Sequence, residues 1–209
     1  MSNRLWKRTT PAITPRLSLG GGDQGVLDED GSKPTIKVDE AVTSWSKTKP
    51  KKGGETLYNY GAQKVAIFGL GQIGCTPAEL GKYDTNGSAC VDTINDAVRL
   101  FNNRLKPLVD DFNKNLPGAK FTLINITNIS GGDPSSAGIT VINTPCCNAT
   151  KSSGLCYRNQ APCSNRSTYA FWDAFHPTEI INVITAGRVY NASSPLDAYP
   201  VDICTLAHL

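Results

Sequence analysis

The residues best suited to chemistry in this chain are an aspartate and a histidine three positions apart, Asp173 and His176. Pro177 follows the histidine, and an apolar-periodic stretch begins soon afterwards. On a turn ahead of a helix, such a pair can present both side chains to one cleft, where the carboxylate orients the imidazole and stabilises its charge. The spacing therefore favours a general base of the kind that hydrolytic reactions need. A structural alternative stays open, in which Asp173 caps a turn and His176 is an ordinary surface histidine.

Short apolar runs predict the strands that would position this pair. Val65–Leu70 is nearly continuous and ends at Gly71, as expected for a buried parallel strand. Phe121–Ile126 predicts a second strand, and Ile139–Ile142 predicts a short third. Apolar residues at helical spacing after Pro177 predict a helix, and a proline suits its first turn. This order of elements indicates an α/β fold with a right-handed parallel crossover.

One long amphipathic helix is predicted between the first two strands. Apolar residues recur there at the period of a helix with one face on a sheet. They are Val91, Ile94, Val98, Phe101, Leu105, Leu108, Phe112 and Leu116. Pro107 falls inside this pattern and is expected to kink the helix, at about 3 kcal/mol relative to a good helix former. Pro117-Gly118 is expected to end it.

Two longer blocks of sequence resemble the plant GDSL esterase/lipase family. One is Leu57–Val65, continued by Phe68–Pro77, and the other is Tyr169–Glu179, which follows a group of cysteines. The resemblance runs from about Leu57 to about Ala192, in the family's order and spacing. It implies the three-layer α/β/α SGNH-hydrolase (flavodoxin-like) fold, present here as an incomplete C-terminal portion.

The same resemblance implies a function. It is the hydrolysis of carboxylic (acyl or acetyl) esters by a Ser-His-Asp mechanism, on a small acyl-ester or lipid substrate. His176 matches the family's catalytic histidine, and Asp173 matches its triad aspartate. The family's serine nucleophile lies in a Gly-Asp-Ser block. Its oxyanion donors are that serine's amide, a glycine in a second block and an asparagine in a third. None of the three blocks is found in this sequence.

No residue is assigned as the nucleophile. Gly22-Asp23-Gln24 is the nearest match to the missing block, but an amide stands where serine is required, and so short a match arises by chance. Ser130, Ser135 and Ser136 lie in sequence typical of a turn. We therefore expect little or no turnover from this chain alone. The alternative function is that of a non-catalytic secreted-type glycoprotein fragment, from a truncated or mis-joined gene.

Residues 1–56 are interpreted as a leader outside the family domain, which spans residues 57–209. The leader has little apolar periodicity and a basic run from Lys47 to Lys52, so it lacks the apolar surface that would offset its ordering entropy. We expect it to be mostly disordered, and the tail that carries Cys204 and His208 to be frayed. A domain without its front strands leaves an unpaired edge beside the first predicted strand, which predicts a marginal or aggregation-prone product.

The cysteines indicate disulfides rather than a metal site. Seven cysteines are unusual for a cytosolic enzyme. A zinc site is the alternative, but no Cys-x-x-Cys spacing occurs and His176 is the only histidine near the cluster. The disulfide candidates are Cys75, Cys90, Cys146, Cys147, Cys156 and Cys163, with Cys75–Cys90 as one expected closure. Because seven is odd, at least one thiol is unpaired or pairs outside the chain.

Glycosylation sequons also favour an extracellular, secreted protein. The candidates are Asn86, Asn125, Asn128, Asn148, Asn165 and Asn191. No apolar h-region follows Met1–Arg8, so no signal peptide is found in this sequence. A formal net charge of +3 with 19% charged residues does not indicate nucleic-acid binding. No stretch reaches the roughly 20 apolar residues of a transmembrane helix, and the oligomeric state is unknown.

The glycines Gly69, Gly71 and Gly74 have the spacing of a dinucleotide-binding fingerprint. However, Cys75-Thr76-Pro77 stands where the helix of that motif should begin, and no acidic residue lies about 20 positions further on after a second strand. The motif is therefore interpreted as a glycine-rich turn after a strand, and no cofactor is predicted.

Overall fold

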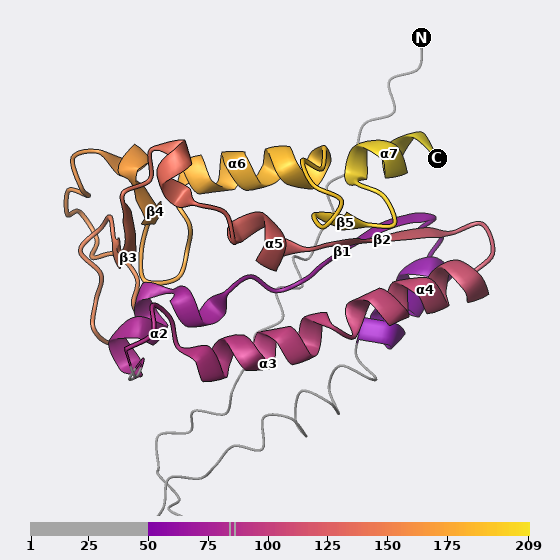
Figure 1. Ribbon diagram of the computed structural model, residues 1–209, viewed down its shortest axis with the longest axis horizontal. Coiled ribbons are helices and arrows are strands. Elements are labelled where there is room, and N and C mark those ends of the chain that lie inside the picture. Colours follow the sequence, from indigo (N-terminus) through magenta and orange to yellow (C-terminus); the bar gives the residue numbers. More distant parts are fainter. Residues whose placement is uncertain (1–49, 84, 86) are drawn as a thin grey trace, which may run out of the picture. The chain divides into compact units, whose positions relative to one another are not determined.

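The computed structural model describes residues 50–83, 85 and 87–209. Its main sheet has three strands in the order β1-β2-β5 (Figure 1). β1 (Lys64–Phe68) runs parallel to β2 (Lys120–Ile124), and β5 (Ala198–Tyr199) pairs antiparallel with β2. The parallel pairing expected for the first two strands is thus confirmed.

Helices cover both faces of this sheet (Figure 1). α3 (Asp92–Asn102) and α4 (Leu105–Asn115) lie on one side. The other side carries α5 (Ile126–Ser130), α6 (Glu179–Tyr190) and α7 (Ile203–His208). The arrangement is the predicted three-layer α/β/α fold.

Alternate side chains of the strands pack into two separate hydrophobic cores, one on each face of the sheet. Phe121 of β2 packs toward α4, with its ring centroid 4.5 Å from that of Phe112. Ile124 belongs instead to the core with Ile129 of α5 and Val189 of α6. This alternation follows from the pleat of a strand, in which successive side chains point to opposite faces.

The remaining elements are short. They are η1 (Ile73–Cys75), α2 (Pro77–Lys82), η2 (Pro134–Ala137), η3 (Arg166–Thr168), and a second sheet in which β3 (Val141–Pro145) runs parallel to β4 (Tyr169–Phe171). The predicted third strand therefore exists, but it begins at Val141 rather than at Ile139, which is buried just ahead of it.

The single long helix predicted up to Leu116 is wrong, because the chain forms two helices there. α3 ends at Asn102 and α4 begins at Leu105, just before Pro107. Proline has no N–H to donate, and its ring clashes with the carbonyl four residues earlier, which here belongs to Asn103. The predicted apolar face is nevertheless the buried one, since Val98 and Phe112 are almost inaccessible.

Residues 50–59 form a helix, so the expected disorder does not hold for residues 50–56. This helix packs against α4 because Gly54 has no side chain: a Cβ atom there would lie 2.4 Å from the Phe112 ring. Lys51 and Asp111 form an exposed ion pair of 3.0 Å, and Tyr58 joins the α4 core. Residues 1–49 lie outside the described residues.

β1 is the edge of the main sheet among the described residues, in agreement with the unpaired edge predicted beside the first strand. In the part of the chain that the structure describes, β1 pairs with β2 alone. Its end residues are exposed and its middle residues are half-buried, so the fully buried strand predicted from the apolar run is wrong. Marginal stability and aggregation through this edge stay predictions.

The C-terminal tail, expected to be frayed, is the helix α7. Asp202 caps it by accepting a hydrogen bond from the Thr205 amide, and Leu206 is buried. The His208 Nδ1 atom lies 2.7 Å from the Cys204 carbonyl, and Lys64 of β1 donates to the Ala207 carbonyl. The tail thus packs against the edge strand.

Candidate active site

The loop between β4 and α6 presents the Asp-x-x-His pair. The Trp172 amide donates to the His176 carbonyl over 2.8 Å, which closes the turn. Thr178 fixes the far end, because its amide donates to the Ala170 carbonyl and its hydroxyl to the Tyr169 carbonyl. α6 begins at Glu179, so Pro177 precedes the helix rather than occupying its first turn.

Asp173 and His176 are in direct contact. The Asp173 Oδ2 and Oδ1 atoms lie 2.8 Å and 3.0 Å from His176 Nδ1. Oδ1 also accepts hydrogen bonds from the backbone amides of Phe175 and His176, over 2.8 Å and 2.7 Å. The carboxylate is therefore both the cap of the turn and the partner of the imidazole. The two interpretations of the motif are not exclusive.

The two members of the pair differ in exposure. Asp173 is only 5% exposed, whereas the His176 side chain is 67% exposed. Burial by itself raises the pKa of Asp173. The amides of His176 and Phe175 and the imidazole outweigh that effect and hold the pKa below its ordinary value. A buried carboxylate that stays ionised can fix the Nδ1–H tautomer of the ring, which leaves Nε2 free to accept a proton.

Acidification is expected to destabilise the fold through Asp173 and Asp197. Burial raises the pKa of Asp197, but hydrogen bonds from Arg188 and Asn128 outweigh this effect and hold its pKa below the ordinary value, as at Asp173. A depressed native pKa means that the folded state binds fewer protons than the unfolded state. The contribution of these two carboxylates to the free energy of unfolding is therefore fully present at pH values above their unfolded pKa of about 3.9. It is lost as the pH falls through their native pKa values. The midpoint of thermal unfolding should drop over the range below about pH 4. A midpoint that stays constant over that range would contradict the expectation.

Within the described ranges, no hydroxyl or thiol hydrogen-bonds to the His176 imidazole. The serines considered from the sequence are bound within their own turns. The Ser130 hydroxyl donates to the Ile126 carbonyl, Ser135 to the Asp133 carboxylate and Ser136 to the Asp133 carbonyl. None of the three is brought to the Asp–His pair.

All six candidate cysteines form disulfides. Cys75–Cys90, the expected closure, ties the loop after β1 to the start of α3. Cys146–Cys163 and Cys147–Cys156 close the loop ahead of β4. The Cys146 and Cys147 amides donate to the carbonyls of Phe171 and Trp172, so this loop is attached to the strand that leads into the Asp–His turn. Cys204 is the free thiol among the described residues.

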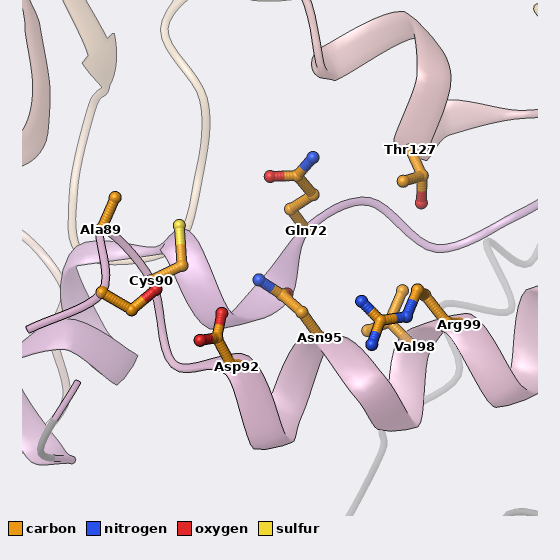
Figure 2. A pocket seen from close by; sticks show the side chains of 9 residues that line it. Gln72, Ala89, Cys90, Asp92, Asn95, Val98, Arg99 and Thr127 are labelled. Atoms are coloured by element: carbon orange, nitrogen blue, oxygen red, sulfur yellow. The ribbon is translucent and has the colours of Figure 1, made fainter. Parts of the chain in front are cut away.

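The glycine-rich segment after β1 packs against α3. The Gly74 amide donates to Asn95 over 2.9 Å, and a Cβ atom at Gly74 would lie 2.4 Å from the Val91 carbonyl. Close packing thus accounts for this glycine, in keeping with the interpretation as a turn. A neighbouring cavity of about 260 Å³ is lined by Gln72 from this segment, Arg99 from α3 and Thr127 from α5. Figure 2 shows these side chains.

Sequence reasoning missed a buried ion pair. Asp197 is fully buried, and its Oδ1 atom accepts from Arg188 Nη2 over 2.5 Å and from the Asn128 side chain over 2.7 Å. Its Oδ2 atom accepts from Arg188 Nε and from the Ser193 and Ser194 amides, each over 3.1 Å. No local sequence signal could have found this group, since its members meet only through tertiary packing.

The sequons differ in their surroundings. Asn148, Asn165 and Asn191 are exposed. Asn125 caps α5 through a hydrogen bond from the Asn128 amide. The Asn128 side chain is engaged by Asp197, and Asn86 lies outside the described residues.

A sheet with helices on both faces defines the class as a protein with an α/β/α hydrolase fold, and the loop ahead of α6 places a buried carboxylate against an exposed imidazole. Comparison with known proteins agrees. The model of the GDSL-like Lipase/Acylhydrolase family matches residues 30–188, a match that begins well before Leu57. The chain belongs to this family.

Curated relatives come from Arabidopsis thaliana. GDSL esterase/lipase At1g29670 is 49% identical over 158 residues, which cover 73% of this chain and 43% of the relative. GDSL esterase/lipase At4g18970 is 47% identical over 158 residues, which cover 73% of this chain and 44% of the relative. GDSL esterase/lipase 7 is 40% identical over 159 residues, covering 73% and 43%. The chain therefore spans less than half the length of these relatives.

Among the described residues, none of the helices has the length and apolar character that a membrane-spanning segment needs.

Proposed function

We propose that this chain carries the acid–base part of an esterase that hydrolyses carboxylic (acyl or acetyl) esters. The observation that carries the proposal is the 2.8 Å contact between the buried Asp173 carboxylate and His176 Nδ1, with the ring exposed on its other side. Membership of the GDSL-like lipase family supports an ester or lipid substrate.

The chemistry divides between the two residues. His176 Nε2 takes the proton of a serine hydroxyl as that oxygen attacks the ester carbonyl, and then returns it to the leaving alcohol. Asp173 holds the ring in the Nδ1–H tautomer and stabilises the imidazolium that forms. The backbone amides on Asp173 Oδ1 keep the carboxylate ionised and fixed. The serine and the oxyanion donors, typically worth about 3 kcal/mol each, belong to blocks that this sequence does not show.

We further propose that the protein folds in an oxidising, exported compartment. Three disulfides within 209 residues support this location, because such bonds persist outside the reducing cytosol. The exposed Asn165 and Asn191 are the sequons at which a glycan meets least obstruction, because the side-chain nitrogen of the exposed Asn148 donates to Gln160 over 2.8 Å. At Asn128, a glycan would compete with the contact to Asp197.

Hydrolysis of p-nitrophenyl acetate and butyrate tests the proposed role of His176. The chain alone should give the same rate as His176→Ala. Residues 50–209, which keep the helix of residues 50–59 whole, should hydrolyse the ester when they are fused behind the front part of GDSL esterase/lipase At1g29670. In that fusion, His176→Ala should abolish the activity. His208→Ala, which changes the only other histidine, should leave it intact.

Two outcomes would contradict this proposal. Hydrolysis by the fusion that survives His176→Ala would remove His176 from the mechanism. Hydrolysis by the chain alone that depends on His176 would show that the sequence contains a nucleophile after all.

A further inference from the structure

The Asp–His turn is contacted by a glycine from the disulfide-closed loop. Gly154 adopts a left-handed backbone conformation, with φ of +69°. A Cβ atom at this position would lie 2.6 Å from Cε2 of the Phe175 ring and 3.0 Å from Cβ of Ala174. Real Cβ atoms do not approach ring carbons so closely, so any side chain at Gly154 would displace Phe175 or the loop.

Backbone hydrogen bonds join the same two segments. The Ala174 amide donates to the Gly154 carbonyl over 3.0 Å, and the Gly154 amide donates to the Thr150 carbonyl over 2.9 Å. The Cys147–Cys156 disulfide spans this part of the loop, so Gly154 is held inside a short covalent ring. On the opposite side, the Ala78 amide at the start of α2 donates to the Ala174 carbonyl over 3.0 Å.

These contacts converge on the two residues between the acid and the base. Ala174 and Phe175 are the only residues that separate Asp173 from His176. A shift of the backbone of either one changes the path that sets the distance between the Asp173 carboxylate and His176 Nδ1. It also moves the Phe175 amide, which donates to Asp173 Oδ1.

We propose that Gly154 is a positioning residue for the Asp173–His176 pair. Because Gly154 has no side chain, the disulfide-closed loop can pack against the turn at Ala174 and Phe175, and this contact sets the tautomer of the His176 ring. The catalytic consequence rests on the function proposed above, but the effect on the ring does not.

Nitrogen-15 NMR of the imidazoles in the full chain tests the proposal. The wild-type His176 should be in the Nδ1–H form, because Nδ1 lies 2.8 Å from the Asp173 carboxylate and donates to it. Gly154→Ala should shift it toward a mixture with the Nε2–H form. Gly138→Ala is the matched control, since Gly138 has φ of +76° and a Cβ atom there would have no neighbour within 4 Å. Gly138→Ala introduces the same backbone strain and should leave the tautomer of the His176 ring unchanged.

A rescue variant separates the contact from general loss of structure. Phe175→Ala combined with Gly154→Ala removes the clashing ring and should restore the Nδ1–H form, or restore folding if Gly154→Ala alone does not fold. A folded Gly154→Ala protein with the wild-type tautomer would overturn the proposal. So would a double variant that restores neither property, or a Gly138→Ala protein that loses the tautomer equally.

Discussion

Asp173→Asn in the active fusion is expected to lower kcat by roughly 10³- to 10⁴-fold, with a much smaller change in KM. The amide can keep its oxygen toward the backbone amides of Phe175 and His176, so the turn can retain its shape. Its NH2 group then faces Nδ1 and donates to it. The ring is driven into the Nε2–H tautomer, in which the nitrogen that must accept the serine proton is already occupied.

The control for this change is Asp133→Asn. Asp133 also accepts a backbone amide two residues ahead, that of Ser135, but no histidine contacts it. Asp133→Asn should leave kcat within a factor of about two. Equal losses in the two variants would mean that a turn cap, and not the Asp–His contact, supports activity. Steady-state kinetics on p-nitrophenyl butyrate give the comparison.

Asp197→Ala is expected to lower the free energy of unfolding by about 3 to 5 kcal/mol, toward the lower figure because the Arg188 side chain is 25% exposed. The variant leaves Arg188 without its carboxylate and leaves the Asn128 side chain and two backbone amides without their acceptor. Since these groups join α5, α6 and the loop before β5, the loss should affect the whole fold. Denaturant unfolding followed by circular dichroism measures it.

Asp96→Ala provides the matched comparison for Asp197→Ala. Asp96 pairs with Arg99 on the exposed surface of α3, where solvent screens the interaction. We expect no resolvable change in the unfolding midpoint. A similar loss in both variants would show that burial does not distinguish the two ion pairs.

The sequence by itself determined the family-like order of elements, the Asp–His pair and the set of cysteines that form disulfides. These are local or pattern-based properties. An apolar run indicates a strand, an apolar period indicates a helix face, and an Asp-x-x-His spacing places two side chains on one turn. The strand pairing of β1 with β2 followed from the same pattern, because a helical connection between two apolar strands favours a parallel crossover.

Two predictions from the sequence are wrong because the conformation or the packing of the chain differs from what the local pattern indicates. Pro107 predicts a kink in one helix, yet the chain separates into α3 and α4, because the proline has no N–H to donate and its ring would clash with the Asn103 carbonyl in a continuous helix. Residues 50–56 carry too little apolar surface to order themselves, but Gly54 lets their helix approach Phe112 closely, and Tyr58 of the same helix packs against the α4 core.

Only the tertiary structure decided what surrounds the Asp–His pair. The contact of Gly154 with Phe175, and the attachment of the disulfide loop to β4, join segments that no periodicity relates. The Asp197 group is the same kind of feature, since Asn128, Arg188 and Asp197 meet only when α5 and α6 pack on one face of the sheet. Such contacts depend on distances in space, whereas sequence patterns report only the local conformation of the chain.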